Sequence, residues 1–273
     1  MYAEPIYICG TARNCAPYLP RVLENMSLIG RLFASFHIII AVSDDSPADI
    51  EILRNHSLTK TGNLTSIQIN RDPLQPRTVN IAAARNATLH ILRERVSAIP
   101  THYIMIDCDD VCSQPINLRI FIMAYNQRRQ WDAISFAPTP YYDLWALAVP
   151  PYVFSYSNFS NGRAMYEDYI NRILEKTPKG GLISVWSAFC GFGIYKWWMS
   201  NGVYDGHYRT NYIPPAILSR NIIAMGGPIR RAPHPTIPFG EPDADCEHRV
   251  FHLQAVFHQG ARIRIFNNTL FGS

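Results

Sequence analysis

Short apolar runs alternate with segments of helical periodicity along much of this sequence, and that alternation constrains its fold more than any other feature. Strand-like runs are found at residues 6–9, 36–42, 65–70 and 103–107. Helices are predicted between them, over 19–29, 46–55 and 78–96. Such an order is typical of a parallel sheet, because parallel neighbours need a long crossover connection. The sequence therefore predicts an α/β fold with a mostly parallel central sheet flanked by helices.

The second part of the chain is less regular. Strands are predicted over 131–136, 141–147 and 261–266, and helices over 164–174 and 247–259. A glycine-rich stretch spans 179–193, and proline-rich loops are predicted over 213–243. Because no linker-like segment separates the parts, we expect one domain over 1–273, with halves at 1–112 and 113–273.

Composition excludes several classes of protein. With 48% hydrophobic residues the chain can form a core without disulfides. The net charge of +4 is spread along the chain, so no nucleic-acid partner is expected. No apolar run of about 18 residues and no N-terminal leader is present, so we expect no membrane span and a cytoplasmic protein. The sequence does not indicate an oligomeric state.

The six cysteines are scattered and form no Cys-x-x-Cys pair, so a structural zinc site is not expected. A disulfide framework would be unusual in a chain of this length. We interpret most of these cysteines as small buried hydrophobic residues in a reducing compartment.

The strongest chemical signal is Asp107-Cys108-Asp109, directly after an apolar strand. Side chains two apart in a strand point to one side, and ligands of open α/β sheets bind at the carboxyl ends of strands. Two adjacent carboxylates repel each other unless a cation joins them. Mg²⁺ prefers one or two carboxylates with phosphate oxygens and water, and Mn²⁺ suits the same ligands. A solvated acidic turn is the alternative.

Polar loops follow the first two predicted strands. One comprises Thr11, Ala12, Arg13 and Asn14, and the other contains Asp44. In a parallel sheet both loops would lie beside the Asp107 strand, where the first could bind a nucleotide and the second a base or ribose. Taken singly, each is most often a turn with a helix cap.

Arg77 directly precedes the predicted helix 78–96, and Arg85 lies within it, eight residues further on. They fall within about 80° of each other around the helix, so both could reach one anionic ligand. A surface helix face with scattered arginines is the alternative.

A cluster of acidic residues and histidines follows residue 244. Asp245 or Glu247 is a candidate general base for deprotonating a hydroxyl, and His252 is a candidate for completing a metal shell. A buried structural role is the alternative for each histidine.

Aromatic residues and glycines mark a further candidate site. Aromatic rings pack against the C–H faces of sugars, although large aromatics are core residues by default. The candidates for binding a sugar acceptor are Tyr142, Trp145, Trp186 and Gly191.

Taken in order, these motifs resemble a family of GT-A glycosyltransferases found in large DNA viruses of algae and amoebae. The family is distantly similar to the fungal capsule-associated mannosyltransferases. The resemblance rests on Gly-Thr-Ala-Arg-Asn, Ser-Asp-Asp-Ser, Ile-Ala-Ala-Ala-Arg-Asn, Ile-Asp-Cys-Asp-Asp, Tyr-Asp-Leu-Trp-Ala-Leu, Ala-Phe-Cys-Gly-Phe-Gly-Ile-Tyr and Asp-Cys-Glu-His. It covers most of the chain.

The resemblance implies a Rossmann-like GT-A fold, a nucleoside-diphosphate sugar donor and a Mn²⁺ or Mg²⁺ cofactor. Both UDP-linked and GDP-linked donors stay open, and we favour UDP. The first half would bind the nucleotide sugar and the second half a glycan acceptor. Asp107 and Asp109 would hold the metal and diphosphate. Nucleotide contacts would come from Thr11 to Asn14, Asp44, Arg77, Arg85 and Asp107. A viral member would act in the host cytoplasm.

Two other functions stay open. A sugar nucleotidyltransferase also combines an α/β sheet with a metal, but it would need more glycines after the first strand than Gly10 alone. A non-catalytic carbohydrate-binding module would explain the aromatics but would leave the two carboxylates without a purpose.

Overall fold

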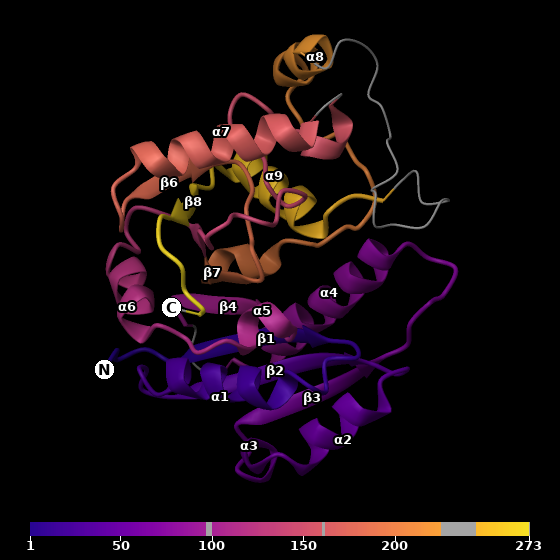
Figure 1. The fold of residues 1–273 in the computed structure, drawn as a ribbon. Coiled ribbons are helices and arrows are strands. Elements are labelled where there is room, and N and C mark those ends of the chain that lie inside the picture. Colours follow the sequence, from indigo (N-terminus) through magenta and orange to yellow (C-terminus); the bar gives the residue numbers. More distant parts are fainter. Residues whose placement is uncertain (97–99, 160–161, 225–243, 273) are drawn as a thin grey trace.

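A computed structural model describes residues 1–96, 100–159, 162–224 and 244–272 (Figure 1). The described strands form one eight-stranded sheet in the order β3-β2-β1-β4-β7-β5-β8-β6. Strands β6 and β7 run antiparallel to their neighbours, and the others share one direction. The strands are β1 (Ile6–Ala12), β2 (Phe36–Ser43), β3 (Leu64–Ile69), β4 (His102–Asp107), β5 (Ala133–Phe136), β6 (Leu182–Val185), β7 (Phe192–Lys196) and β8 (Ile263–Phe266).

Helices cover both faces of this sheet (Figure 1). The α-helices are α1 (Leu19–Gly30), α2 (Pro47–Asn55), α3 (Ser57–Lys60), α4 (Arg77–Arg95), α5 (Asp110–Ser113), α6 (Leu118–Asn126), α7 (Gly162–Lys176), α8 (Pro215–Ala224) and α9 (Glu247–Gln259). In the described ranges, the 3-10 helices are η1 (Tyr156–Asn158) and η2 (Trp197–Asn201). The predicted class, α/β with a mostly parallel sheet flanked by helices, is confirmed. One sheet runs through both parts of the chain, while the division into halves at residue 112 stays a prediction.

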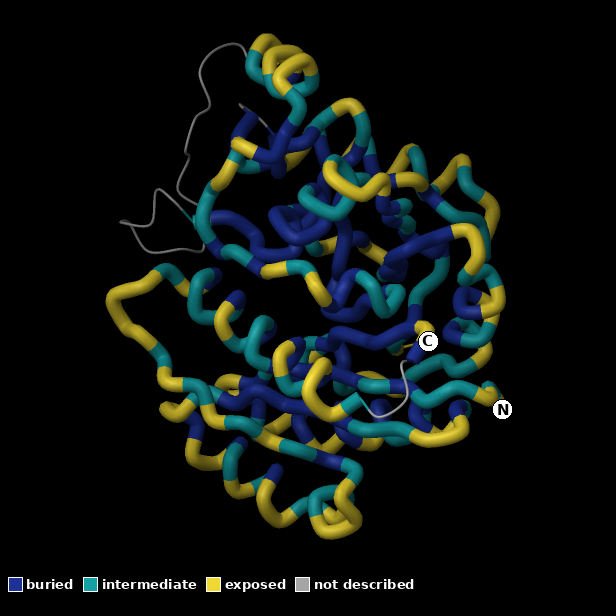
Figure 2. Tube along the Cα trace, turned by 180° about the vertical axis from the view of Figure 1, so that it is seen from behind, coloured by how far each residue is buried: buried dark blue, intermediate teal, exposed yellow. Residues whose placement is uncertain are grey.

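The strand alternation creates two cores, one on each face of the sheet. Ile8 and Ile38 pack with α1, α2 and α6 on one face. Cys9 and Ile39, one residue further along each strand, pack with α4, α7 and α9 on the other. Successive side chains of a strand point to opposite faces, so a strand buried on both sides is apolar throughout. Figure 2 shows the central strands buried and the outer turns of the helices exposed.

Three segments differ from the expected secondary structure. Residues 141–147, expected as a strand, form turns in which the Asp143 carboxylate accepts a hydrogen bond from the Ala146 amide. β6 and the first two residues of β7 lie in the glycine-rich stretch, where no strand was predicted, and part of the proline-rich stretch forms α8. Residues 225–243 lie outside the described part. Gly193 suits β7 because a Cβ there would lie 2.7 Å from the Tyr195 ring. The glycine at position 193 is therefore explained by close packing within β7.

All six cysteines are free and buried, as expected for small hydrophobic residues. Among the described residues, no helix combines the length and the apolar composition needed to cross a bilayer.

Leu89 tests how α4 is held on the sheet. It is fully buried, so we expect Leu89→Ala to lower the free energy of unfolding by about 2–5 kcal/mol. Leu74 is 91% exposed, and Leu74→Ala should change it by less than about 0.5 kcal/mol. Urea unfolding of both variants checks this packing, and equal effects would contradict it.

Candidate functional site

The carboxyl ends of β1, β2 and β4 meet at one edge of the sheet, and β4 ends there at Asp107. Thr11 lies opposite Asp107, and its carbonyl accepts a hydrogen bond from the Cys108 amide at 3.3 Å. On the other side, the Asp107 amide donates to the Gly191 carbonyl at 2.8 Å. The Asp107 backbone is thus fixed between β1 and the turn before β7.

Asp109 lies just beyond the end of β4, so it is not oriented in the way that we expected from strand alternation. β4 ends at Asp107, and Asp109 is the extended N-cap residue of α5, so strand alternation does not orient its side chain. Its Oδ1 atom is buried and has no hydrogen-bond partner among the described residues. Leaving a buried carboxylate oxygen unpaired costs free energy, so this atom is suited to accept a cation.

The surroundings of Asp109 disfavour its charge. Its pKa is raised from 3.8 to about 7, first by burial and then by the negative charges of Asp107 and Asp110. The backbone amides of Val111 and Cys112 oppose this rise. A cation placed between these carboxylates would favour the charged form.

Arg85 reaches this edge from the middle of α4 and is almost fully buried. Its Nη2 donates to Oδ1 of Asp107 at 2.8 Å, and its Nε donates to Oε1 of Glu247 at 3.0 Å. The guanidinium also lies over the Phe189 ring, 4.9 Å from its centroid. Burial opposes the charge, but the two carboxylates raise the pKa of Arg85. Arg85 therefore joins α4, β4 and α9 at one point.

Arg77, the other predicted arginine, has different surroundings. It is the first residue of α4 and is exposed, whereas Arg85 is buried. The eight residues between them span about 12 Å along the helix axis. In the described part of the chain, Arg85 contacts the carboxylates and Arg77 contacts neither of them.

The structure places both predicted bases in ion pairs. Asp245 is 2% exposed, pairs with Arg249 and accepts a hydrogen bond from the Cys246 amide at 2.8 Å. Glu247, also buried, pairs with Arg85. The roles of Asp245 and Glu247 as candidate bases stay predictions.

His252 lies inside the core beneath the site. Its Nδ1 is 3.0 Å from the Ser187 hydroxyl, and its Nε2 is 3.1 Å from the Tyr195 hydroxyl. Burial and the charge of Arg85 lower the pKa of His252 to about 3. No group of three or more His, Cys, Asp or Glu side chains within the described ranges is arranged to hold a metal ion. His252 is therefore not gathered with Asp107 and Asp109 into such a group.

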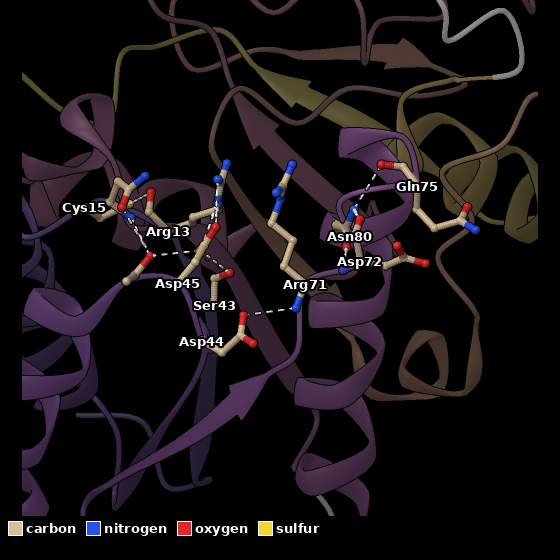
Figure 3. A network of polar contacts seen from close by, with 11 residues as sticks. Arg13, Cys15, Ser43, Asp44, Asp45, Arg71, Asp72, Gln75 and Asn80 are labelled. Atoms are coloured by element: carbon tan, nitrogen blue, oxygen red, sulfur yellow. Dashed lines mark hydrogen bonds and ion pairs between the residues drawn. The ribbon is translucent and has the colours of Figure 1, made fainter.

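The loops after β1 and β2 are joined by an ion pair (Figure 3). Arg13 Nη2 contacts Asp45 Oδ2 at 2.9 Å, and hydrogen bonds from Arg13 and Ser43 lower the pKa of Asp45 to about 2. Ala12 ends β1, and Asn14 has a left-handed backbone (φ 55°), a conformation that asparagine tolerates. The predicted loop of residues 11–14 thus lies at the sheet edge beside the β2 loop.

The loop after β3 joins the same network. The sequence analysis did not include this loop in the candidate site. Asp44 Oδ1 accepts a hydrogen bond from the Arg71 amide at 3.1 Å. The Arg71 and Arg13 side chains extend in the same direction from their loops (Figure 3). The signal was present, because Arg71 is the second residue after β3, which is parallel to the first two strands.

The predicted acceptor residues lie in two environments. Tyr142 is 44% exposed, and its hydroxyl would lie 3.2 Å from a Cβ added at Gly191. Trp145 and Trp186 are half-buried, and Trp186 packs edge-on against Phe257. Tyr142 and Gly191 are thus neighbours beside Asp107, whereas both tryptophans pack against the core.

Comparison with known proteins identifies similar folds. No protein-family model and no curated protein matches the sequence. TarS residues 1–349 of S. aureus, in complex with UDP-GlcNAc, is 12% identical over 98% of this chain and 57% of that chain, with a TM-score of 0.47. The mannosyltransferase PcManGT from Pyrobaculum calidifontis, in complex with GDP-Man and Mn²⁺, is 13% identical over 75% and 48%, with a TM-score of 0.44.

The galactosyltransferase LgtC, in complex with donor and acceptor sugar analogues, is 11% identical over 70% of this chain and 57% of that chain, with a TM-score of 0.36. The chain thus spans only about half to three-fifths of the length of these proteins. At such identities the similarity concerns the fold alone.

Asp109 should make stability depend on pH. Its raised pKa means that the native state binds the proton more tightly than the unfolded chain, so this stabilisation is present below about pH 4 and is lost as the pH rises through about 7. Without metal, we expect the free energy of unfolding of Asp109→Asn, relative to that of the wild type, to rise by about 1–3 kcal/mol when the pH is raised from about 5 to about 8.

Urea unfolding in EDTA at both pH values measures this difference. Asp110 is exposed, and Asp110→Asn should show no comparable change between the two pH values. A pH-independent difference between the wild type and Asp109→Asn would refute the explanation.

Proposed function

We propose that this chain is a GT-A-type glycosyltransferase that transfers a sugar from a nucleoside-diphosphate donor to a hydroxyl of a glycan acceptor. The observation that carries the proposal is the pair Asp107 and Asp109 at the carboxyl edge of the sheet, with one Asp109 oxygen buried and unpaired. Open α/β sheets bind their ligands at this edge.

The carboxylates fit a divalent cation. Burial and mutual repulsion disfavour the charge of Asp109, and Arg85 offsets part of the negative charge through Asp107. Mg²⁺ and Mn²⁺ accept one or two carboxylates when phosphate oxygens and water complete the shell. Asp107 and Asp109 would hold the ion, which would neutralise charge on the departing diphosphate. This ligand set needs no third protein residue, so His252 is not required for it.

Nucleotide recognition fits the polar network on the neighbouring strand ends. Arg13 and Asn14 follow β1, and Asp44 follows β2. Arg77 begins α4 and is exposed to solvent. Arginine side chains pair with phosphate oxygens, and a carboxylate accepts hydrogen bonds from ribose hydroxyls or base N–H groups. In this proposal, Arg85 acts differently: it orients Asp107 rather than contacting the nucleotide.

The proposal has finer parts. The donor is UDP-linked rather than GDP-linked, and the transferred sugar is a hexose or a pentose. Tyr142 and Gly191 contact the acceptor, and Trp145 and Trp186 support that region from the core. The protein acts in the cytoplasm.

Calorimetry with UDP tests the donor site. We expect UDP to bind in the presence of Mn²⁺, and EDTA to weaken binding by about tenfold or more, because the ion links the carboxylates to the diphosphate. Asp109→Asn should weaken the Mn²⁺-dependent binding by a similar factor and leave thermal unfolding cooperative. Asp110→Asn removes a neighbouring exposed charge and serves as the matched control. Equal UDP affinity with and without Mn²⁺ would refute the metal assignment.

A further inference from the structure

Asp143 stands out because the proposed donor site leaves it without a role. It lies in the turn region 141–147, and the backbone holds it at two points. Its Oδ1 accepts a hydrogen bond from the Ala146 amide at 3.3 Å, and its Oδ2 accepts one from the Cys190 amide at 3.1 Å. The carboxylate therefore has a fixed orientation, with no ion pair to any described residue.

One turn connects Asp143 to the metal-binding motif. Cys190 and Gly191 both have left-handed backbones, with φ of 53° and 77°. The Cys190 amide donates a hydrogen bond to Asp143. The carbonyl of the following residue, Gly191, accepts a hydrogen bond from the Asp107 amide at 2.8 Å. Non-glycine residues rarely adopt such a backbone, and strained residues of this kind cluster at functional sites. The turn places the Asp143 carboxylate beside the edge where β4 ends.

The other acidic side chains of this cluster are already engaged. Asp107 and Glu247 bind Arg85, and Asp245 binds Arg249. Asp109 is assigned to the metal. Among the residues that the structure describes, no basic side chain bonds to Asp143. Asp143 therefore keeps the proton-accepting capacity that an ion pair would reduce.

The electrostatic surroundings agree with this geometry. Burial raises the pKa of Asp143 to about 6, against the hydrogen bonds from the Ala146 and Cys190 amides; the charges of Asp107 and Glu247 add to the rise. At neutral pH the group is mostly ionised and is a stronger base than an ordinary aspartate. A base is most effective when its pKa is near the working pH.

We infer that Asp143 is the proton acceptor for the sugar-accepting hydroxyl, with the exposed ring of Tyr142 beside it to hold the acceptor. The inference rests on the proposed transferase function. The acceptor O–H bond breaks, its proton goes to the Asp143 carboxylate, and the oxygen uses the freed electron pair to bond to the anomeric carbon. The bond from that carbon to the diphosphate breaks on the opposite side, and its electron pair leaves with the nucleoside diphosphate. The proton then passes to water.

This direct displacement inverts the anomeric configuration, which gives two independent readouts. The wild type, Asp143→Asn, Asp143→Glu and the control Asp168→Asn are assayed with UDP-glucose, UDP-xylose and GDP-mannose, Mn²⁺ and a panel of octyl glycosides. Asp168 lies on the exposed side of α7 in a surface ion pair, so its variant tests the loss of a remote carboxylate. Steady-state rates yield kcat and KM, and NMR of the glycoside gives the anomer.

We expect a β-linked product from these α-linked donors. Asp143→Asn should lower kcat about 10²–10⁴-fold, with the donor KM and Mn²⁺-dependent UDP affinity retained. Asp143→Glu should lower kcat by less, and Asp168→Asn should match the wild type. An α-linked product, or near-wild-type turnover by Asp143→Asn, overturns the role of Asp143 and leaves the transferase function standing.

Two further outcomes are decisive. If Asp143→Asn loses UDP binding, Asp143→Glu serves as the test variant instead. Its added methylene displaces the accepting oxygen, so an unchanged kcat in Asp143→Glu overturns the inference. If the wild type binds no UDP and turns over no donor, the proposed function fails and the inference fails with it.

Discussion

The buried guanidinium of Arg85 is the interaction on which the rest of the site depends. It contacts Asp107 at the end of β4 and Glu247 at the start of α9, which lie far apart in the sequence. Breaking such a pair would leave an uncompensated buried charge, so Arg85, Asp107 and Glu247 depend on one another. Phe189 covers the guanidinium on one side and also stacks on His248. The first and last thirds of the chain are therefore joined at the position where chemistry is proposed.

This arrangement leaves the edge of the sheet with more negative than positive charge. Arg85 contacts two carboxylates, while Asp109 and Asp143 have raised pKa values and no basic side chain that bonds to them in the described ranges. A fold that keeps such charges close together gives up stability for a site that can bind a cation and a proton. The neighbouring Arg13 and Arg71 are more exposed than Arg85, and Arg13 pairs with Asp45 (Figure 3).

Much of the fold could be predicted from the sequence, because the spacing of apolar residues and the local composition indicated the same helices and strands. The first strands and helices were expected close to their observed bounds, as was α9. The strand expected at 141–147 was wrong, because an aromatic run can be buried in a turn as well as in a strand. β6 and β7 were missed because glycines interrupt the apolar pattern of this stretch, and Gly193 within β7 makes room for Tyr195.

The site was only partly predictable for a related reason. The position of Asp107 at a strand end was predicted, but the ion pair of Glu247 with Arg85 depends on α9 reaching α4, which no local pattern encodes. Asp143 was hidden within a segment interpreted as a strand. The turn before β7 has a further consequence: a Cβ at Gly191 would lie 3.1 Å from Cys112 and 3.2 Å from the Tyr142 hydroxyl. Any larger residue there would have to displace these two side chains beside the carbonyl that accepts the hydrogen bond from the Asp107 amide.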